Sequence, residues 1–177
     1  MEQNPWTTLA AEVKYDNPWI NVTEFQVLNP AGNPGIYGKV HFKNIAIGVL
    51  PLDEDNNTWL VGQYRYVLDA YSWEIPEGGC PIGKEDPLEC AMRELEEETG
   101  IKAKIYEKIL TLHNSNSVSD EIAYIYVAKG LTFGEAMPEE TEDLRVKKVH
   151  LSEALQMVLR GEITDAMTVA AILAASR

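Results

Sequence analysis

Residues 79–101 read GCPIGKEDPLECAMRELEEETGI, and they contain the clearest helix signal in the chain. Asp86 is a natural N-cap, and Pro87 occupies the first helical position. Gly100 suits the left-handed conformation that ends many helices. The start and stop signals therefore agree, and they predict a helix over residues 87–99.

Three glutamates share one face of that predicted helix, because Glu94, Glu97 and Glu98 lie at positions i, i+3 and i+4. A like-charge i,i+4 pair costs about 0.2–0.5 kcal/mol, and carboxylates near the C-terminal end oppose the helix dipole. Folding alone gives no reason for this arrangement. A hard divalent cation held by carboxylate oxygens would turn the repulsion into affinity. The alternative is a solvated acidic face in an acidic protein.

The glutamates belong to a longer pattern, Gly-x5-Glu-x7-Arg-Glu-Leu-x-Glu-Glu-x-Gly-Ile, which runs from Gly79 to Ile101. This stretch matches the whole 23-residue signature of the Nudix hydrolases, and the chain resembles that family here. A chance match is on the order of 10⁻⁸ per starting point. The resemblance implies an α/β fold, the Nudix α/β/α sandwich with a mixed sheet, whose loop–helix–loop motif binds one to three Mg²⁺ or Mn²⁺ ions.

The resemblance implies a role for each carboxylate of the motif. Glu94 and Glu98 are expected to be the principal metal ligands. Glu97 is expected to be a further ligand or the group that orients the attacking water. A backbone carbonyl of Gly78 or Gly79 is expected to add a ligand from the preceding loop.

Structural roles are expected for the other positions of the motif. Gly79 and Gly100 are expected to form turns, and Leu95 to pack in the core. Arg93 is expected to pair with a motif carboxylate such as Glu85 rather than with substrate.

Sequence upstream of the signature indicates a substrate class. Residues 63–65 (QYR) and 74–76 (EIP) resemble the corresponding segment of ADP-ribose pyrophosphatases and related nucleoside-diphosphate-sugar hydrolases. The resemblance implies that Arg65 grips the pyrophosphate, which suits a fork of donors facing paired anionic oxygens, and that Glu74 belongs to the same site. A strand-end salt bridge is the alternative for Arg65.

Sequence downstream of the signature extends the resemblance to this subgroup. Residues 117–121 (SVSDE) look like its Gly-Phe-Ser-Asp-Glu stretch, which implies that Ser119 and Glu121 bind substrate. The subgroup usually has a proline where this chain has residues 114–116 (NSN). Because of this departure, nucleotide sugars such as GDP-mannose stay among the candidate substrates.

The acidic loop over residues 138–143 (PEETED) is expected to join the catalytic groups. In the subgroup, a glutamate of this loop acts as general base or completes the metal shell. Alignment of residues 144–154 with the subgroup favours Glu140 as the base and Glu142 as a metal or water ligand. The predicted catalytic set is therefore Glu97, Glu140 and Glu142. The alternative is a solvated loop.

The sequence predicts a small β-hairpin appendage over residues 1–43. The Nudix domain is expected over residues 44–177. Such a hairpin is too small to be stable alone. In the resembling subgroup it exchanges between the subunits of a homodimer and helps hold the nucleobase, so a homodimer is expected. Trp19, Phe25 or Tyr37 could stack on the base, although a buried core position is the alternative for each. Strands are predicted over residues 19–28, 36–42, 45–52, 58–66, 71–75, 101–112, 121–129 and 144–151, and closing helices after Ser152 and Thr164.

Composition excludes several classes of partner. The 177 residues include 28 acidic against 15 basic side chains, and the resulting net charge of −13 repels polyphosphate, so no nucleic-acid partner is expected. The longest apolar run, residues 169–175, is far shorter than a bilayer span, and the chain start lacks the basic segment of a signal peptide. We therefore expect no membrane association, a cytoplasmic location, and free thiols at Cys80 and Cys90.

The predicted reaction is metal-dependent hydrolysis of the pyrophosphate bond of ADP-ribose or a nucleoside-diphosphate sugar, giving a nucleoside monophosphate and a sugar phosphate. One alternative is a Nudix pyrophosphatase for another nucleotide, such as a dinucleoside polyphosphate or a damaged nucleotide. Another is a catalytically silent Nudix module that binds nucleotides. The silent module is disfavoured because such members typically lose motif carboxylates, and all are present here.

Overall fold

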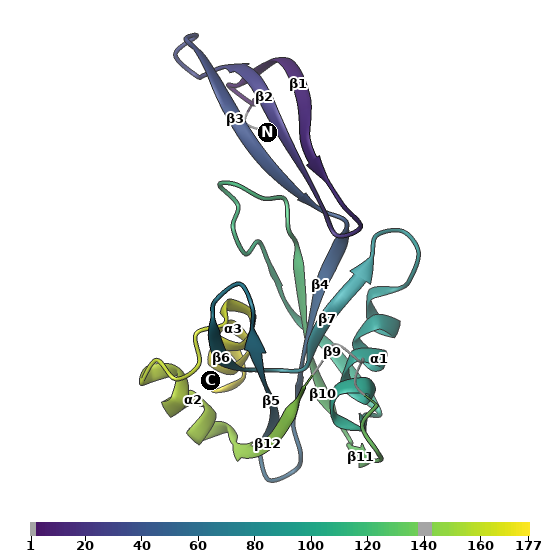
Figure 1. The fold of residues 1–177 in the computed structure, drawn as a ribbon. Coiled ribbons are helices and arrows are strands. Elements are labelled where there is room, and N and C mark those ends of the chain that lie inside the picture. The colour runs from purple at the N-terminus through teal and green to yellow at the C-terminus, as the bar shows by residue number, and fades with distance from the viewer. Residues whose placement is uncertain (1–2, 138–142) are drawn as a thin grey trace. The chain divides into compact units, whose positions relative to one another are not determined.

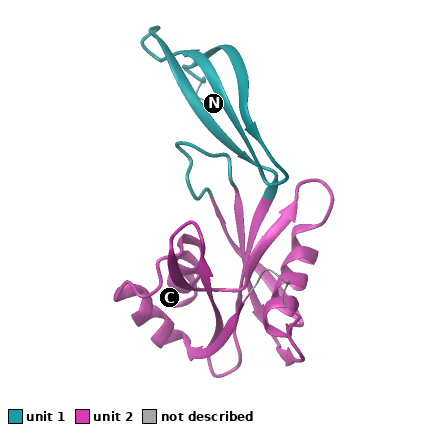
Figure 2. Ribbon diagram, in the orientation of Figure 1, with its two compact units in different colours: residues 1–44, 113–121 teal, residues 45–112, 122–177 magenta. Residues whose placement is uncertain are grey.

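The computed structural model describes residues 3–137 and 143–177 of the chain. It divides into two compact units, which Figure 2 colours separately. The first unit contains residues 1–44 and 113–121, and the second contains residues 45–112 and 122–177. Among the described residues, no helix has the length and apolar character needed to cross a membrane.

The first unit is built on an antiparallel sheet of three strands, β1 (Thr7–Asp16), β2 (Ile20–Leu28) and β3 (Pro34–Phe42). The sequence patterns predicted β2 and β3, but they missed β1. Every residue of β1 is exposed in this chain, so the strand lacks the alternation of buried and exposed side chains that such predictions use. The turn between β2 and β3 places Gly32 at φ +83°, a conformation that favours glycine.

Asp120 fastens the loop over residues 113–121 to β3 within the first unit. Its carboxylate accepts hydrogen bonds from Phe42 N and Lys39 Nζ, both at 3.1 Å, and lies 2.8 Å from His41 Nδ1. Burial alone would raise the pKa of Asp120, but these partners, His41 first, lower it below its ordinary value. The backbone of Val40 also pairs with the loop.

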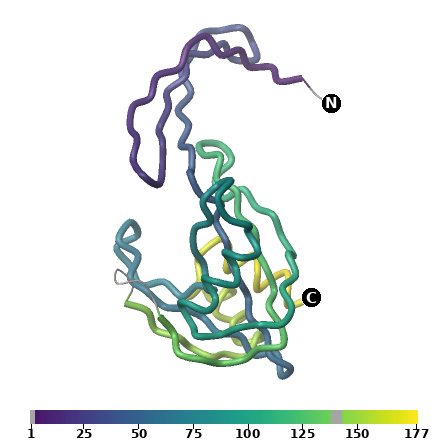
Figure 3. The backbone as a smooth tube through the Cα atoms, turned by 90° about the vertical axis from the view of Figure 1, so that its right-hand side faces the viewer, coloured from purple at the N-terminus to yellow at the C-terminus, as the bar shows by residue number. Residues whose placement is uncertain are grey.

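The second unit is a mixed α/β domain in which strands lie between helices, with α1 on one side and α2 and α3 on the other (Figures 1 and 3). Its largest sheet has the order β7-β4-β10-β9, and a second sheet has the order β12-β5-β6. Within the first of these, β10 runs parallel to β4 and antiparallel to β9, so the sheet is mixed. The element bounds are β4 (Asn44–Pro51), β5 (Asn57–Arg65), β6 (Ala70–Glu74), β7 (Glu77–Pro81), α1 (Pro87–Thr99), β8 (Ile101–Lys102), β9 (Ile105–Leu112), β10 (Ala123–Lys129), β11 (Thr132–Phe133), β12 (Arg145–His150), α2 (Leu151–Leu159) and α3 (Ala166–Ala175).

Alternating side chains of β4 build two hydrophobic clusters on opposite faces of the sheet. Ile47 and Val49 belong to the cluster beside α1, where Leu95 is fully buried. Leu50 belongs to the other cluster, which Met157 of α2 helps to form. Burying a side chain of this size stabilises the fold by about 1.5–3 kcal/mol. The α1 cluster matters most for function, because it fixes the position of the glutamate-bearing helix.

The predicted helix over residues 87–99 is confirmed at both ends. The Asp86 side chain accepts a hydrogen bond of 2.8 Å from Leu88 N, and Gly100 adopts φ 70° while its N–H donates to Glu96 O. Elsewhere the predicted boundaries differ. The strand predicted over residues 101–112 is broken into β8 and β9, and β7 was not predicted, because its two glycines and its proline are unfavourable in strands.

Candidate active site

The glutamate face of α1 points inward. Glu94 and Glu98 are only 9% and 2% exposed, whereas Glu97 is partly buried. The helix is held in this rotation because Ala91 and Leu95 on its adjoining face are fully buried in the α1 cluster. The packing of the helix therefore withdraws two like-charged side chains from water.

Arg93 ties the glutamates to the preceding loop. Its Nη1 lies 2.9 Å from both Glu94 Oε1 and Glu97 Oε2. Its Nη2 lies 3.7 Å from Glu85 Oε2 and donates weakly, at 3.5 Å, to Gly79 O. Arg93 thus pairs with carboxylates of the motif and reduces the repulsion between two of them.

The loop at β7 lies directly against this face of α1. A Cβ added to Gly78 would come within 2.2 Å of Glu94 Cδ, so only a glycine lets the loop approach so closely. The backbone N–H of Glu77 donates a 3.1 Å hydrogen bond to Glu98 Oε2. These two contacts bring the predicted carbonyl ligand Gly78 beside the predicted carboxylate ligands.

Arg65, at the end of β5, is held by two acidic residues. Its Nε lies 3.0 Å from Glu74 Oε1, and its Nη2 contacts both Glu74 Oε2 and Glu77 Oε1, the latter at 2.8 Å. Burial of the guanidinium lowers the pKa of Arg65, but the two carboxylates outweigh this and raise it, so Arg65 is charged. Glu77 in turn links Arg65 to Glu98 through its backbone N–H.

Glu77 is the functional candidate that the sequence analysis did not single out. Its pKa is raised well above the ordinary value, chiefly by burial and then by the negative charges of Asp165 and Glu74, against the opposing charge of Arg65. Its Oε2 is buried and has no hydrogen-bond partner among the described residues. No local sequence pattern marks Glu77 as buried, because its burial depends on the strand β7, which was not predicted.

The donor set of this site fits a divalent cation. Six carboxylates are held here by two guanidinium groups and the backbone N–H of Glu77. Four of them are largely buried, namely Glu74, Glu77, Glu94 and Glu98, and buried carboxylates in such excess are costly unless a cation joins them. The carboxylates that the structure describes here offer oxygen ligands, which suit Mg²⁺ or Mn²⁺. The buried, unpartnered oxygen of Glu77 and the close approach of Gly78 to Glu94 support the same conclusion.

The remaining predicted site residues lie in the first unit or outside the described residues. Trp19, Ser119 and Glu121 belong to the first unit, where Trp19 is 66% exposed and Glu121 accepts a hydrogen bond from Asn114. The predicted catalytic residues Glu140 and Glu142 lie outside the described residues.

The prediction of free thiols was wrong. Cys80 and Cys90 form a disulfide, with their Cα atoms 5.7 Å apart. The spacing of ten residues resembled no disulfide framework, and the pairing depends on β7 lying beside α1, which the sequence analysis did not predict. The link joins the loop and the helix that carry the predicted metal ligands.

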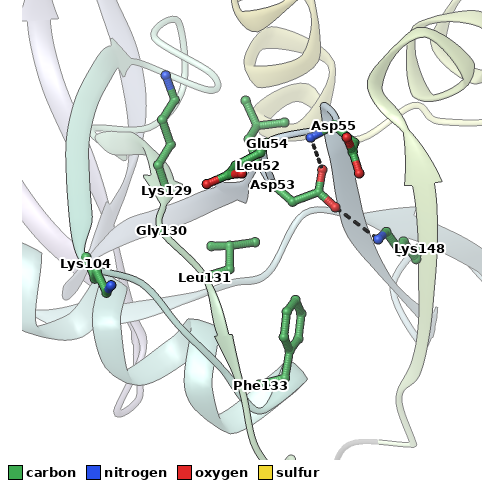
Figure 4. Close-up of a pocket in the computed structure, with 10 residues that line it drawn as sticks. All are labelled: Leu52, Asp53, Glu54, Asp55, Lys104, Lys129, Gly130, Leu131, Phe133 and Lys148. Atoms are coloured by element: carbon green, nitrogen blue, oxygen red, sulfur yellow. Dashed lines mark hydrogen bonds and ion pairs between the residues drawn. The ribbon is translucent and has the colours of Figure 1, made fainter.

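A separate hollow of about 450 Å³ opens near the turn between β4 and β5 (Figure 4). Three lysines line the hollow, namely Lys104, Lys129 and Lys148. The other lining residues are the acidic Asp53, Glu54 and Asp55, together with Leu52, Gly130, Leu131 and Phe133. Asp53 forms a 3.0 Å ion pair with Lys148. None of the predicted site residues that the structure describes lines this hollow.

The mixed α/β fold and the capped helix with its inward glutamates define the class of the protein, a hydrolase of the Nudix type. The chain belongs to the Nudix family, because the NUDIX domain profile matches residues 42–170. A second profile, the nucleoside diphosphate sugar hydrolase N-terminal domain, matches residues 6–40. Nudix hydrolases generally use divalent metal ions.

Two relatives and one solved structure agree with this assignment. The chain is 30% identical to the ADP-ribose pyrophosphatase of Mycobacterium tuberculosis, over 98% of this chain and 84% of the relative. It is 38% identical to the ADP-ribose pyrophosphatase of Bacillus subtilis, over 72% and 69% of the two chains. A crystal structure of an ADP compounds hydrolase superposes with a TM-score of 0.87 at 20% identity, covering 99% and 95% of the two chains. The predicted fold class and the assignment as a Nudix hydrolase are confirmed.

Proposed function

We propose that this protein hydrolyses the pyrophosphate bond of ADP-ribose or a nucleoside-diphosphate sugar and releases a nucleoside monophosphate and a sugar phosphate. The observation that carries the proposal is the excess of buried carboxylates where α1, β7 and Arg65 meet. An acidic protein of net charge −13 cannot attract a diphosphate by its overall field, so the attraction must be local. The relatives named as ADP-ribose pyrophosphatases support the choice of substrate.

Glu94 and Glu98 would hold the cation, with Glu97 and the carbonyl of Gly78 or Gly79 as further ligands. A bound Mg²⁺ or Mn²⁺ would polarise the phosphoryl oxygens and lower the pKa of the attacking water. The helix packing and the contact between Gly78 and Glu94 support a site that would be arranged before an ion binds. We expect the site to bind one to three of these ions.

Arg65 would bind the pyrophosphate. Its contacts with Glu74 and Glu77 use Nε and Nη2, and its side chain keeps 37% exposure, so Nη1 is the edge offered to an anionic oxygen. The two carboxylates fix the direction of the guanidinium and keep it charged. Glu74 would therefore act in substrate binding through Arg65.

The proton of the attacking water would pass to a carboxylate, for which Glu97, Glu140 and Glu142 are the candidates. Glu97 shares its face of α1 with Glu94 and Glu98, and its Oε2 lies 2.9 Å from Arg93 Nη1, which supports its candidacy. Turnover measured against pH for single glutamine variants of the three residues separates them, because only the variant of the base loses the acidic limb of the pH profile, where turnover rises as the base is deprotonated.

The first unit would bind the nucleobase and a second subunit. The unit exposes large apolar side chains, namely Leu9, Val13, Ile36 and Tyr37 on its sheet and Trp19 in the turn between β1 and β2. A three-stranded sheet with such a surface is small for independent stability, which supports a homodimer in which this unit is exchanged. Ser119 and Glu121 would contribute to substrate binding from the same unit. Light scattering tests the assembly, with a mass twice the 19.8 kDa of the chain expected.

A product assay tests the proposed function. The protein is incubated with ADP-ribose, GDP-mannose, a dinucleoside polyphosphate and an oxidised nucleotide, each with and without Mg²⁺. Release of AMP and ribose 5-phosphate, or of GMP and mannose 1-phosphate, only with the cation supports the proposal. Cleavage confined to the other two compounds replaces it with a different Nudix activity, and binding without cleavage indicates the silent module.

A further inference from the structure

The Cys80–Cys90 disulfide lies between the two segments that carry the predicted metal ligands. Cys80 follows Gly78 and Gly79 in β7, and Cys90 lies one helical turn before Glu94 in α1. The covalent link therefore holds the glycine loop beside the glutamate face.

The link is placed where a small movement would reach the metal site. Both cysteines are fully buried in the α1 cluster, so they cannot shift without disturbing the packing of the helix. Glu85 Oε2 lies 3.0 Å from Cys90 Sγ and 3.7 Å from Arg93 Nη2. Arg93 in turn contacts Glu94 and Glu97, so the disulfide adjoins the ion-pair network of the site.

Without the disulfide, only non-covalent contacts would hold the glycine loop at β7 beside α1. The turn that follows Cys80 is open, since Ile82 is exposed and Gly83 adopts φ +73° with no atom near its added Cβ. The non-covalent restraints are the pairing of β7 with β4, the packing of Gly78 against Glu94, and the hydrogen bonds that Glu77 and Gly79 make with Glu98, Arg65 and Arg93. A cross-link over so short a loop removes open conformations of the chain.

We propose that Cys80 and Cys90 form a redox-controlled clamp that sets the affinity of the site for its divalent cation. In the oxidised protein the loop and α1 are locked together. A dithiol reductant breaks the S–S bond by two-electron transfer, giving two cysteine thiols while the reductant becomes its own disulfide. The freed loop then samples positions in which the glycine carbonyls lie away from Glu94 and Glu98. The clamp rests on the proposed metal site.

The test compares the full chain in its two redox states. The reduced form is prepared with dithiothreitol, the oxidised form with diamide, and each state is assigned by alkylation and intact mass. Mg²⁺ affinity is measured by titration calorimetry, and circular dichroism establishes that both forms are folded. We expect affinity in the reduced form to fall by roughly threefold or more and to recover on reoxidation, because preorganisation is lost.

A double variant, Cys80→Ala with Cys90→Ala, serves as the matched control. It is expected to bind Mg²⁺ like the reduced protein and to ignore both reagents. Because the main comparison uses one unaltered sequence, it stands even when the double variant fails to fold.

Four results would overturn the clamp. They are equal Mg²⁺ affinity in both redox states, two unpaired thiols after diamide, a bond that dithiothreitol never reduces, and stoichiometric zinc uptake by reduced Cys80, Glu85 and Cys90. Equal and measurable affinity defeats the clamp alone. Absence of Mg²⁺ binding in both states, together with absence of hydrolysis, defeats the proposed function and the clamp with it.

Discussion

The carboxylate of Glu94 lies so close to Gly78 that a Cβ on this glycine would come within 2.2 Å of Glu94 Cδ. The contact joins a loop and a helix that are sixteen positions apart in the sequence. A side chain at position 78 would therefore conflict with the neighbouring carboxylate. Catalysis in this chain is therefore expected to depend on the loop as much as on the helix.

Gly78→Ala is expected to weaken Mg²⁺ binding, because the added methyl group must displace either the loop or the Glu94 carboxylate. Calorimetric titration should show at least about a tenfold loss of affinity, comparable to the loss of a supporting contact at a metal site. Gly38→Ala is the control, since a Cβ there meets no atom within 4 Å. Unchanged Mg²⁺ affinity in the Gly78 variant would show that this loop takes no part in the metal site.

Glu98→Gln is expected to lower turnover by about 100-fold or more, since it removes charge from a buried, preorganised group. The fold should persist, because the amide oxygen can still accept the hydrogen bond from Glu77 N. Steady-state kinetics and thermal unfolding are measured together. Glu89→Gln, at an exposed position of the same helix, should leave turnover unchanged. A folded Glu98 variant with full turnover would remove Glu98 from the metal ligands.

Arg65→Lys keeps the positive charge but loses the planar fork that contacts Glu74 and Glu77. We expect KM to rise about 10- to 100-fold, which corresponds to roughly 1.5–3 kcal/mol for a charge-assisted hydrogen bond. Arg160→Lys, at an exposed ion pair with Glu153 and Glu162, is the control. Lower stability with an unchanged KM would show that Arg65 is only a strand-end salt bridge.

Asp53 predicts a pH dependence of stability. Burial would raise its pKa, but hydrogen bonds from Asn57 and the ion pair with Lys148 lower it to about 2 from 3.8. Because the folded pKa is depressed, the stabilisation is present above pH 4 and is lost as the pH falls towards 2. Asp53→Asn should lower the free energy of unfolding at pH 7 by about 1 kcal/mol, after allowance for solvent screening.

Urea unfolding at pH 7, 4 and 2 checks this expectation, with Asp55→Asn at the exposed neighbouring position as the control. The difference between the Asp53 variant and the natural sequence should close by pH 2. A difference that stays constant across this range would assign the effect to packing rather than to charge.

Local signals explain what the sequence could predict. The helix over residues 87–99 carries its own caps, so both ends were placed correctly, and the glutamate spacing placed three carboxylates on one face. Most strands of the second unit were found from apolar runs. These features depend on residues close together in the chain.

Features that depend on distant packing were missed. The strand β7 contains two glycines and a proline, and its pairing with β4 decides its structure. The burial of Glu77 and the disulfide between Cys80 and Cys90 both follow from that pairing. Since β1 exposes all its residues in this chain, its sequence offered no buried face to detect.

The central claim is that the inward glutamates of α1 hold a divalent cation for cleavage of a diphosphate. Phosphorus NMR of ADP-ribose incubated with the protein tests it most directly, with Mg²⁺ added, withheld or replaced by Mn²⁺. The predicted result is that the diphosphate resonances give way to two monophosphate resonances only when a cation is present. Intact diphosphate resonances with both cations, for ADP-ribose and for nucleoside-diphosphate sugars alike, would contradict the claim.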